Sequence, residues 1–466
     1  MDFITVEERK IPVSADVDIF IAGGGPAGVG AAIQGARAGA KVFLAEKLYA
    51  LGGTLTSGLM SKIAVAGMTN GLPIELIRRF DEYRGTHYLK SRPEVPVDPE
   101  TCKIVLDEMV IRECGVDVHF GTVVGSVVKE GNAIKAVTIH NLDGESAVRA
   151  KYYIDCTGDG QLGFLSGAEC MVEGGGNYSS SPTLMFRIGN ADLEALFRYE
   201  EEHPELFGHV YTTYKRHMMG PELCRENIAH EIYAHMSDFV KLIHLRTSEH
   251  PDAFTEEEKE VLLRRGILLL SQPEPGHVLV NSTSQPEFTG DSEREVSKTM
   301  ADLRRDCHTI FRFAKMFIPG FENAFLMDTA SLLGIRESRR IRGDYVLTQE
   351  DVEAFRKFDD RISSNGGGVE LHSGKANSLI LHEQDGLGTY NVPYRAIIAK
   401  GFTNLLVAGR CFSASHAALS AARNISFCCA LGQAAGAAAA ELSLSGKRDV
   451  RDADIAAIQE IVKDNL

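Results

Sequence analysis

The chain has 466 residues, of which 44% are hydrophobic and 24% charged, and its formal net charge is −15. A chain of this length exceeds the size at which a single core keeps growing, so two or more lobes are expected. The acidic balance disfavours nucleic acid and anionic membrane surfaces as partners, because both attract lysine and arginine.

The N-terminal sequence and the cysteine spacing bear on the location of the protein and on whether it has disulfides or a metal site. The first residues carry charges where a signal peptide needs an apolar stretch, and the Ala-rich run 430–442 is too short and interrupted to cross a membrane. We therefore expect a cytoplasmic protein with no membrane span. Nine cysteines without a C-x-x-C pair indicate neither a disulfide framework nor a metal site.

The most informative segment is residues 18–46, which has the pattern of a β-α-β dinucleotide-binding unit. An apolar run leads into Gly23, Gly25 and Gly28 in G-x-G-x-x-G spacing, and an Ala-rich helical stretch follows. The first glycine permits the tight turn, the second lets the backbone approach a pyrophosphate, and the third brings helix and strand together. We expect the pyrophosphate on the amides at the helix N-terminus.

Glu46 ends the second apolar run of this unit and is placed to accept from a ribose 2′-hydroxyl. That contact disfavours a 2′-phosphate and so argues against NADP. Only one G-x-G-x-x-G unit is present, so a dedicated nicotinamide domain is not expected. Electrons then come from an organic substrate, or leave to oxygen, a quinone or a carrier protein.

The rest of the chain predicts an α/β fold built from both chain ends. Helices are expected at 73–83 and 99–114, and short alternating segments with turn residues between them indicate a small antiparallel meander. Those segments are 116–120, 123–129, 133–140 and 147–153. A final strand at 152–156 enters the loop 157–160.

The region 175–380 is richer in His, Arg and Glu and reads as an inserted α+β substrate lobe, with polar helices at 229–245 and 293–314. The C-terminal part returns to apolar sequence, with a strand at 404–408, a loop at 409–416 and a helix at 417–442. We therefore predict a discontinuous, Rossmann-like domain of residues 1–174 and 381–466 around an inserted domain of residues 175–380.

Four sequence blocks then carry a family resemblance: GGGPAGVGAA…FLAEK with LGGTLTSG, YYIDCTGDG, GIRESRRIRGDYVLT, and NVPYRAIIAKGFTNLLVAGRCFSASHAALSAARNISFCCALGQAAG. Together they cover about a third of the residues. In order and spacing the chain resembles FAD-dependent oxidoreductases, related to the flavoprotein subunits of fumarate reductase and to the glutathione-reductase-like fold.

The resemblance implies FAD bound in an extended conformation across three chain segments. The glycine loop would hold the pyrophosphate, Glu46 the adenosine ribose, Val124 the adenine through its backbone, and the helix after His416 the pyrimidine edge of the flavin. The residues that the resemblance assigns to the cofactor are Gly23, Gly25, Pro26, Gly28, Glu46, Lys47, Gly52, Gly53, Thr54, Val124, Thr157, Gly158, Asp159, Gly409, Arg410, Gly432 and Gln433.

Histidines and arginines supply the candidates for catalysis. His416 directly precedes the helix at the flavin edge, and an imidazole titrating near neutrality suits moving the substrate proton while hydride moves to or from the flavin. The alternative is a histidine that ties the loop by hydrogen bonds. His372 could reach the site from the inserted lobe, and a surface histidine is the alternative there.

An arginine cluster at 336–342 could clamp a substrate carboxylate. If the segment is extended, Arg336, Arg340 and Arg342 share one face with Ser338, and Glu337 lies on the other. The alternative is a salt-bridge network between the lobes. Arg423 is a further anion-binding candidate, and a capping or packing role is its alternative.

The sequence therefore predicts an FAD-dependent dehydrogenase or oxidase that transfers hydride between a small organic substrate and flavin N5. One alternative is the reverse reaction, reduction of an activated alkene as in fumarate reductase. Another is a flavoprotein subunit that needs an electron-accepting partner, and a homo-oligomer is compatible with each. No metal is expected.

Overall fold

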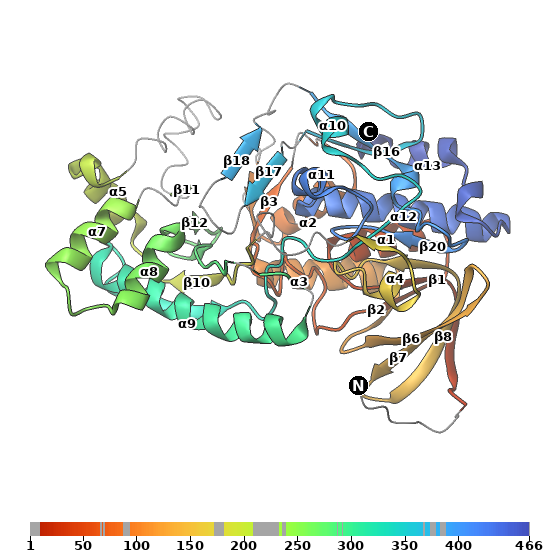
Figure 1. Cartoon of the computed structure of the whole chain (residues 1–466), viewed down its shortest axis with the longest axis horizontal. Coiled ribbons are helices and arrows are strands. Elements are labelled where there is room, and N and C mark those ends of the chain that lie inside the picture. Colours follow the sequence, from red (N-terminus) through yellow and green to blue (C-terminus); the bar gives the residue numbers. More distant parts are fainter. Residues whose placement is uncertain are drawn as a thin grey trace.

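A computed structural model of the chain describes residues 10–65, 68, 70–86, 94–171, 181–207, 233–234, 239–286, 288–290, 292–366, 369–372, 379–382 and 388–465. Its main body lies to the right in Figure 1, and a second lobe with α7, α8 and α9 extends to the left.

The main body is built on a seven-stranded sheet with the order β5-β2-β1-β8-β7-β6, in which β20 also pairs with β8. Strands β1 (Val13–Ala22), β2 (Val42–Ala45), β5 (Asp117–His119) and β20 (Leu405–Val407) run parallel to their neighbours, as expected for a Rossmann-like sheet. Because β20 comes from the C-terminal part, both ends of the chain contribute to one sheet.

The predicted meander is confirmed for three of its four segments. Strands β6 (Val123–Glu130), β7 (Ala133–Asn141) and β8 (Gly144–Asp155) pair antiparallel and project at the lower right of Figure 1. The first predicted segment, 116–120, is instead the parallel edge strand β5. It follows a helix that crosses over from the sheet, and such a crossover delivers a parallel strand.

Two buried helices lie on one face of this sheet. Helix α1 (Pro26–Arg37) packs against α12 (Ile425–Ser445), and both contribute to a core that includes Ile19 and Ile21 of β1. The predicted helix 417–442 is in fact α11 (His416–Ala421) followed by α12. Helix α12 is long and apolar enough to cross a membrane by length and composition, with a mean hydropathy of 1.3, but 89% of its most apolar window is buried inside the protein.

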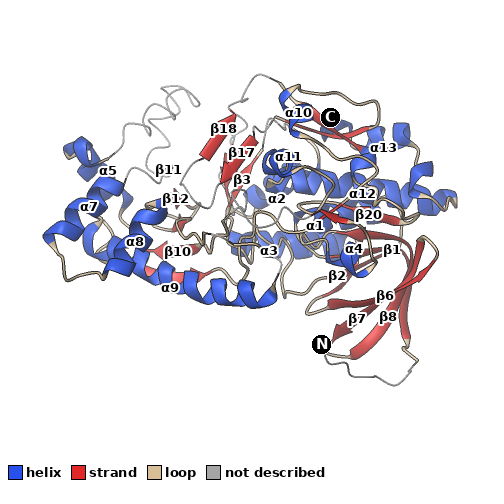
Figure 2. Ribbon diagram, in the orientation of Figure 1, coloured by secondary structure: helices blue, strands red, loops and turns tan. Residues whose placement is uncertain are grey.

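Other elements of the main body surround this core (Figure 2). They are β3 (Lys62–Ala64), α2 (Leu72–Glu82), β4 (Glu94–Pro96), α3 (Pro99–Asp107), α4 (Gln161–Leu165), β9 (Cys170–Met171), β15 (Arg340–Ile341), α10 (Gln349–Glu353), β16 (Arg361–Asn365), β17 (Val369–His372), β18 (Leu379–His382), β19 (Tyr390–Pro393) and α13 (Ile455–Ile461). The predicted helix 99–114 is α3 extended by a π-helical segment, Glu108–Glu113.

The second lobe has its own sheet and its own core. Its five strands have the order β11-β12-β13-β10-β14, and its helices cover that sheet on the left of Figure 1. The elements are β10 (Phe186–Gly189), α5 (Leu193–Glu202), β11 (Tyr233–Ala234), α7 (Val240–Glu249), α8 (Glu256–Arg265), β12 (Leu269–Ser271), β13 (Val278–Val280), α9 (Glu293–Phe317) and β14 (Phe325–Thr329).

Of the two helices predicted for this lobe, one is confirmed and the other is confirmed only in part. The predicted helix at 293–314 is confirmed as α9, whose apolar side packs into the lobe core. The predicted helix at 229–245 is confirmed at 240–245, where α7 begins, and wrong at 233–234, where β11 lies; residues 229–232 and 235–238 are outside the described residues. Polar helical composition does not exclude a short strand that a sheet edge captures.

The predicted end of the insertion, residue 380, stays a prediction, but core packing favours an earlier boundary. The lobe core reaches Leu333, whereas Leu347, Val352 and Ile362 pack into the core of the main body. Ile335 still packs against the lobe core, so the segment after residue 335 returns to the main body and passes beside the candidate site.

Candidate functional site

The glycine loop between β1 and α1 has the geometry that a phosphate-binding turn requires. Gly23 has φ +95°, and a Cβ there would lie 2.6 Å from the carbonyl oxygen of Cys156. A Cβ on Gly28 would lie 1.8 Å from the carbonyl oxygen of Gly23. Both positions exclude any side chain, which explains the tight turn and the close helix predicted from the spacing.

Gly25 differs, because a Cβ built on it meets no atom of the described residues within 4 Å. It is the N-cap of α1, with Pro26 as the first helical residue. Gly53 faces it, since a Cβ on Gly53 would lie 3.1 Å from the Cα of Gly25, and the amide of Gly52 donates to Gly24 at 2.8 Å. The open space beside Gly25, at the positive end of a twelve-residue helix, fits a pyrophosphate.

Glu46 is 4% exposed and holds the loop backbone through both carboxylate oxygens. Its Oε2 accepts from the amide of Gly24 at 2.5 Å, and its Oε1 accepts from the amide of Leu48 at 2.7 Å. Burial raises the pKa of Glu46, against the lowering effect of these two bonds. Each carboxylate oxygen has a second lone pair, so the predicted ribose contact stays a prediction that this geometry permits. The neighbouring Lys47 is exposed.

Val124 lies on β6, where it is paired with Ile139. The turn before it is bonded to the Glu46 loop, since the amide of Thr122 donates to the carbonyl oxygen of Glu46 at 2.9 Å. This places Val124 at the same end of the site as Glu46, and its adenine contact stays a prediction.

The loop after β8 is held by Asp155, a residue that motif reading did not single out. Its fully buried carboxylate accepts from the amide and hydroxyl of Thr157, at 3.0 and 2.7 Å, and from the amide of Gly163 at 2.8 Å. Burial raises the pKa of Asp155. The recognisable signal was an acidic residue at the buried end of an apolar strand, which must find hydrogen-bond donors.

Asp159, at the end of that loop, is joined to Arg410 from the far end of the chain. Arg410 Nη2 donates to Asp159 Oδ1 at 2.6 Å, and the hydroxyl of Ser338 donates to the same oxygen at 2.7 Å. Burial acts to raise the pKa of Asp159, but the positive charge of Arg410 and the Ser338 bond outweigh it, so that pKa is lowered. A Cβ on Gly158 would lie 3.0 Å from Arg410 Nη2, so only glycine leaves the guanidinium this close.

Gly409 connects this network to the phosphate loop. It has φ +82°, and a Cβ there would lie 2.9 Å from the Cβ of Ala27 in the first turn of α1. The structure therefore brings the predicted segments 23–28, 52–54, 157–159 and 409–410 together around the N-terminus of α1. Their contacts with FAD remain predictions.

His416, the first residue of α11, is paired with Glu337. The imidazole Nδ1 contacts Glu337 Oε2, and both side chains are largely buried. Arg340 Nη2 lies 3.1 Å from the other oxygen of Glu337. Sequence reasoning found His416 but treated Glu337 only as a salt-bridge partner, so the structure adds this carboxylate to the site.

The arginine cluster does not share one face as predicted. Arg336 Nη1 donates to the hydroxyl of Thr183 at 2.9 Å, Arg340 Nη1 to the carbonyl of Ala414 at 2.6 Å, and Arg342 Nε to Glu169 at 2.5 Å. The prediction assumed an extended segment, but only 340–341 form a strand and the backbone bends at 336. The premise of a shared face is therefore not met, and the ion pairs of Arg340 with Glu337 and of Arg342 with Glu169 fit the salt-bridge alternative; substrate contacts by Arg336 and Arg340 stay a prediction.

The role predicted for Gly432 and Gln433 at the flavin edge also needs correction. Both lie in the interior of α12, where their amides are within the helix ladder. A Cβ on Gly432 would lie 1.9 Å from the carbonyl oxygen of Ala27. The side-chain Nε2 of Gln433 donates to the side-chain Oε1 of Gln34 at 3.0 Å. These residues pack α12 against α1, and the amides of α12 that lie outside its ladder are those of the first turn, where Asn424 accepts from the amide of Phe427.

Two catalytic candidates remain predictions. Arg423 lies between α11 and α12, close enough that its positive charge acts on Cys428. The backbone of His372 pairs with Leu379 in the β17–β18 hairpin, and its side chain lies outside the described residues. Cys411, which follows Arg410, is buried in the core with its Sγ 3.8 Å from the carbonyl of Asp155, and burial raises its pKa far above the usual range.

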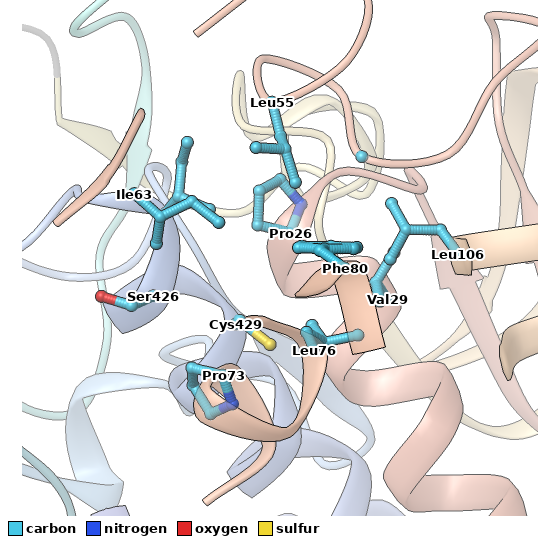
Figure 3. Close-up of a pocket in the computed structure, with 12 residues that line it drawn as sticks. Pro26, Val29, Leu55, Ile63, Pro73, Leu76, Phe80, Leu106, Ser426 and Cys429 are labelled. Atoms are coloured by element: carbon cyan, nitrogen blue, oxygen red, sulfur yellow. The ribbon is translucent and has the colours of Figure 1, made fainter. Parts of the chain in front are cut away.

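A small apolar cavity of about 20 Å³ lies beneath the loop, between Pro26, Leu76, Phe80, Ile425 and Cys429 (Figure 3). A space of this size holds about one water molecule and no ring system. The cavity is therefore a packing gap where α1, α2 and α12 meet, and it is too small to be the predicted cofactor site beside Gly25.

Comparison with known proteins identifies the family of the chain. Residues 18–462 match the family model described as FAD dependent oxidoreductase. Among curated proteins, thiamine thiazole synthase of Pyrococcus abyssi is 28% identical over 163 residues, which are 33% of this chain. Thiamine thiazole synthase of Pyrococcus furiosus is 28% identical over 157 residues. The matches span 61% and 58% of these relatives, less than two thirds of their length.

Two solved structures resemble the chain over most of its length. A geranylgeranyl bacteriochlorophyll reductase-like protein from Thermoplasma acidophilum has a TM-score of 0.49 and 12% identity, over 96% of this chain and 83% of that one. The p-nitrophenol 4-monooxygenase of Pseudomonas putida has a TM-score of 0.44 and 11% identity, over 96% and 84%. From the family match over residues 18–462, the chain belongs to the FAD-dependent oxidoreductases, and its cofactor is FAD.

Proposed function

We propose that the protein oxidises a small organic substrate by hydride transfer, with His416 as the group that takes the substrate proton. FAD supplies the two-electron acceptor for the hydride when it is bound. The observation that carries the proposal is the contact of the His416 imidazole with Glu337 at the start of α11. Ser338, the residue after Glu337, donates to Asp159, and Asp159 accepts from Arg410. Gly409, the residue before Arg410, lies against the first turn of α1 and so beside the phosphate loop.

The chemistry requires a proton acceptor as well as a hydride acceptor. When an alcohol or amine is oxidised, the C–H bond breaks with its electron pair, and the O–H or N–H proton must leave at the same carbon–heteroatom unit. With Nδ1 turned to Glu337, Nε2 is the nitrogen of His416 that takes this proton. In the alternative reaction, reduction of an activated alkene, a hydride adds to one carbon of the C=C bond and a proton to the other, and the same histidine is the acid that supplies this proton.

The test is anaerobic mixing of the FAD-loaded protein with small acids, amines, alcohols and enoates, followed by flavin absorbance. We expect one class to bleach the flavin, and His416→Ala to keep the bound FAD but slow the bleaching by roughly 10²- to 10⁴-fold. His140→Ala, on the exposed meander, is the matched control and should bleach at the native rate. Equal rates for native and His416→Ala would remove this histidine from the reaction.

The same experiment separates the alternatives. Oxidation of the pre-reduced protein by an enoate favours the alkene reductase. Bleaching without turnover in air, restored by an added electron carrier, favours a subunit that needs a partner. The similarity to thiamine thiazole synthases covers only a third of the chain and does not by itself assign their reaction to this protein.

A further inference from the structure

We infer that Glu337 is a positioning residue that fixes the tautomer of His416, and that Arg340 locks Glu337 in place. The inference rests on the proposed role of His416 and adds two residues to it. Its starting point is the contact between His416 Nδ1 and Glu337 Oε2, which joins two segments 79 residues apart in the sequence.

The chemistry of the pair is directional. An ionised carboxylate only accepts hydrogen bonds, so the nitrogen that faces it must carry the proton. Glu337 therefore selects the ring form protonated at Nδ1 and leaves Nε2 as the basic nitrogen. With side chains only 9% and 12% exposed, water competes poorly for either partner.

Arg340 explains why Glu337 stays in this orientation. Its side chain is 1% exposed, and its Nη2 lies 3.1 Å from Glu337 Oε1, the oxygen that does not contact the histidine. Its Nη1 donates at 2.6 Å to the carbonyl oxygen of Ala414, two residues before His416. One guanidinium thus lies between the carboxylate of Glu337 and the backbone that begins α11.

The backbone on both sides is fixed as well. The amide of Ile341 donates to the carbonyl of Cys411 at 2.9 Å, and the amide of Leu347 donates to Ser413 at 3.0 Å. The amide of Ser415 in turn donates to the carbonyl oxygen of Leu347 at 2.8 Å. A side-chain pair mounted on two bonded segments keeps its geometry without help from a ligand, as a preorganised site requires.

The first test uses the FAD-free protein and does not depend on activity. In ¹⁵N-imidazole NMR at a pH of about 9, where an ordinary imidazole is neutral, we expect His416 to carry a proton on Nδ1. Its signal among the 15 histidines is identified by its loss in His416→Ala. A ring protonated only at Nε2 in the native protein overturns the inference, whatever the variants do.

The second test measures flavin reduction by a substrate found in the mixing experiment. Glu337→Gln keeps the size of the side chain but removes its charge, and we expect reduction to slow 10- to 100-fold with KM changed less than twofold. Glu337→Asp should recover part of the rate, and the exposed Glu260→Gln should match the native protein. If His416→Ala is slow but Glu337→Gln is native in rate and tautomer, only this inference fails. If His416→Ala is native in rate, the proposed function fails first.

Discussion

At the scale of single residues, Gly25 is the loop glycine at which a substitution is expected to weaken cofactor binding without disturbing the fold. Its φ of −67° suits any residue, and a Cβ there would meet open space, whereas Gly23 and Gly28 admit no side chain. A substitution at Gly25 therefore leaves the chain folded and fills only the space where the pyrophosphate would approach.

We expect Gly25→Val to be soluble, to melt within about 2 °C of the FAD-free native protein, and to bind FAD at least roughly 100-fold more weakly, since a few kcal/mol of phosphate contacts are lost. Absorbance at the flavin band after dialysis against FAD measures the binding. Gly25→Ala, with a smaller side chain, should be intermediate. A yellow, FAD-loaded Gly25→Val protein would show that the pyrophosphate lies elsewhere.

The contribution of Asp159 to the stability of the fold is expected to depend on pH. Its pKa in the folded chain is lowered by Arg410 and Ser338 despite burial, so the ionised form stabilises the fold. That contribution is complete above the pKa of an unfolded Asp, about 4, and is lost as pH falls through the lower folded value.

Asp159→Asn should therefore lower the free energy of unfolding by about 1–3 kcal/mol at pH 7, and the difference from native should shrink below a pH of about 4. Urea midpoints at pH 7 and at about pH 3 measure it. The exposed Asp143→Asn is the control and should show little difference at either pH. A gap that stays constant with pH would mean that the charge of Asp159 contributes nothing.

At the scale of elements, the α1–α12 contact controls how the two ends of the chain present the site. A Cβ on Gly432 would lie 1.9 Å from the carbonyl of Ala27, and one on Gly436 would lie 2.3 Å from that of Ala31. Both obstacles are backbone atoms, so an added methyl must push the helices apart.

Gly432→Ala should destabilise the protein by about 1–3 kcal/mol and weaken FAD binding as well, since the displaced helix α1 carries the phosphate loop. Thermal melts with and without FAD separate the two effects. Ser445→Ala, exposed near the end of the same helix, should leave both unchanged. Native stability in Gly432→Ala would show that the helices can move apart at no cost.

This contact also shows where sequence reasoning stops. The β-α-β unit around the glycine loop and three of the four meander segments could be predicted because each follows from a local pattern of turns and apolar residues. The role of Gly432 could not, because a glycine within an Ala-rich helix looks the same whether it faces a cofactor or another helix. The position of Glu337 relative to the arginines was predicted wrongly for a related reason. The prediction assumed an extended backbone, in which alternate side chains share a face, and the bend at residue 336 breaks this alternation.

At the scale of the whole molecule, one buried arginine joins the inserted lobe to the main body. Arg187 of β10 is 5% exposed; its Nε donates to Asp328 of β14 at 3.0 Å, and its Nη1 donates at 3.3 Å to Asp98, the N-cap of α3. Burial acts to lower the pKa of Arg187, but the two carboxylates outweigh it and raise that pKa. The guanidinium therefore remains charged and bonded to both parts at once.

We expect Arg187→Met to lower the free energy of unfolding by about 1–3 kcal/mol, below the 3–5 kcal/mol for a fully buried pair, because Asp98 and Asp328 keep some contact with water. The same variant should increase limited proteolysis between the lobes while the isolated protein still takes up FAD, since the partners of Arg187 among the described residues are Asp98, Glu100 and Asp328, which are not predicted cofactor residues. Arg305→Met, whose exposed partner Glu257 lies in the same lobe, is the matched control. A urea midpoint and a cleavage rate equal to those of the control would mean that the lobes are held together by their apolar contacts alone.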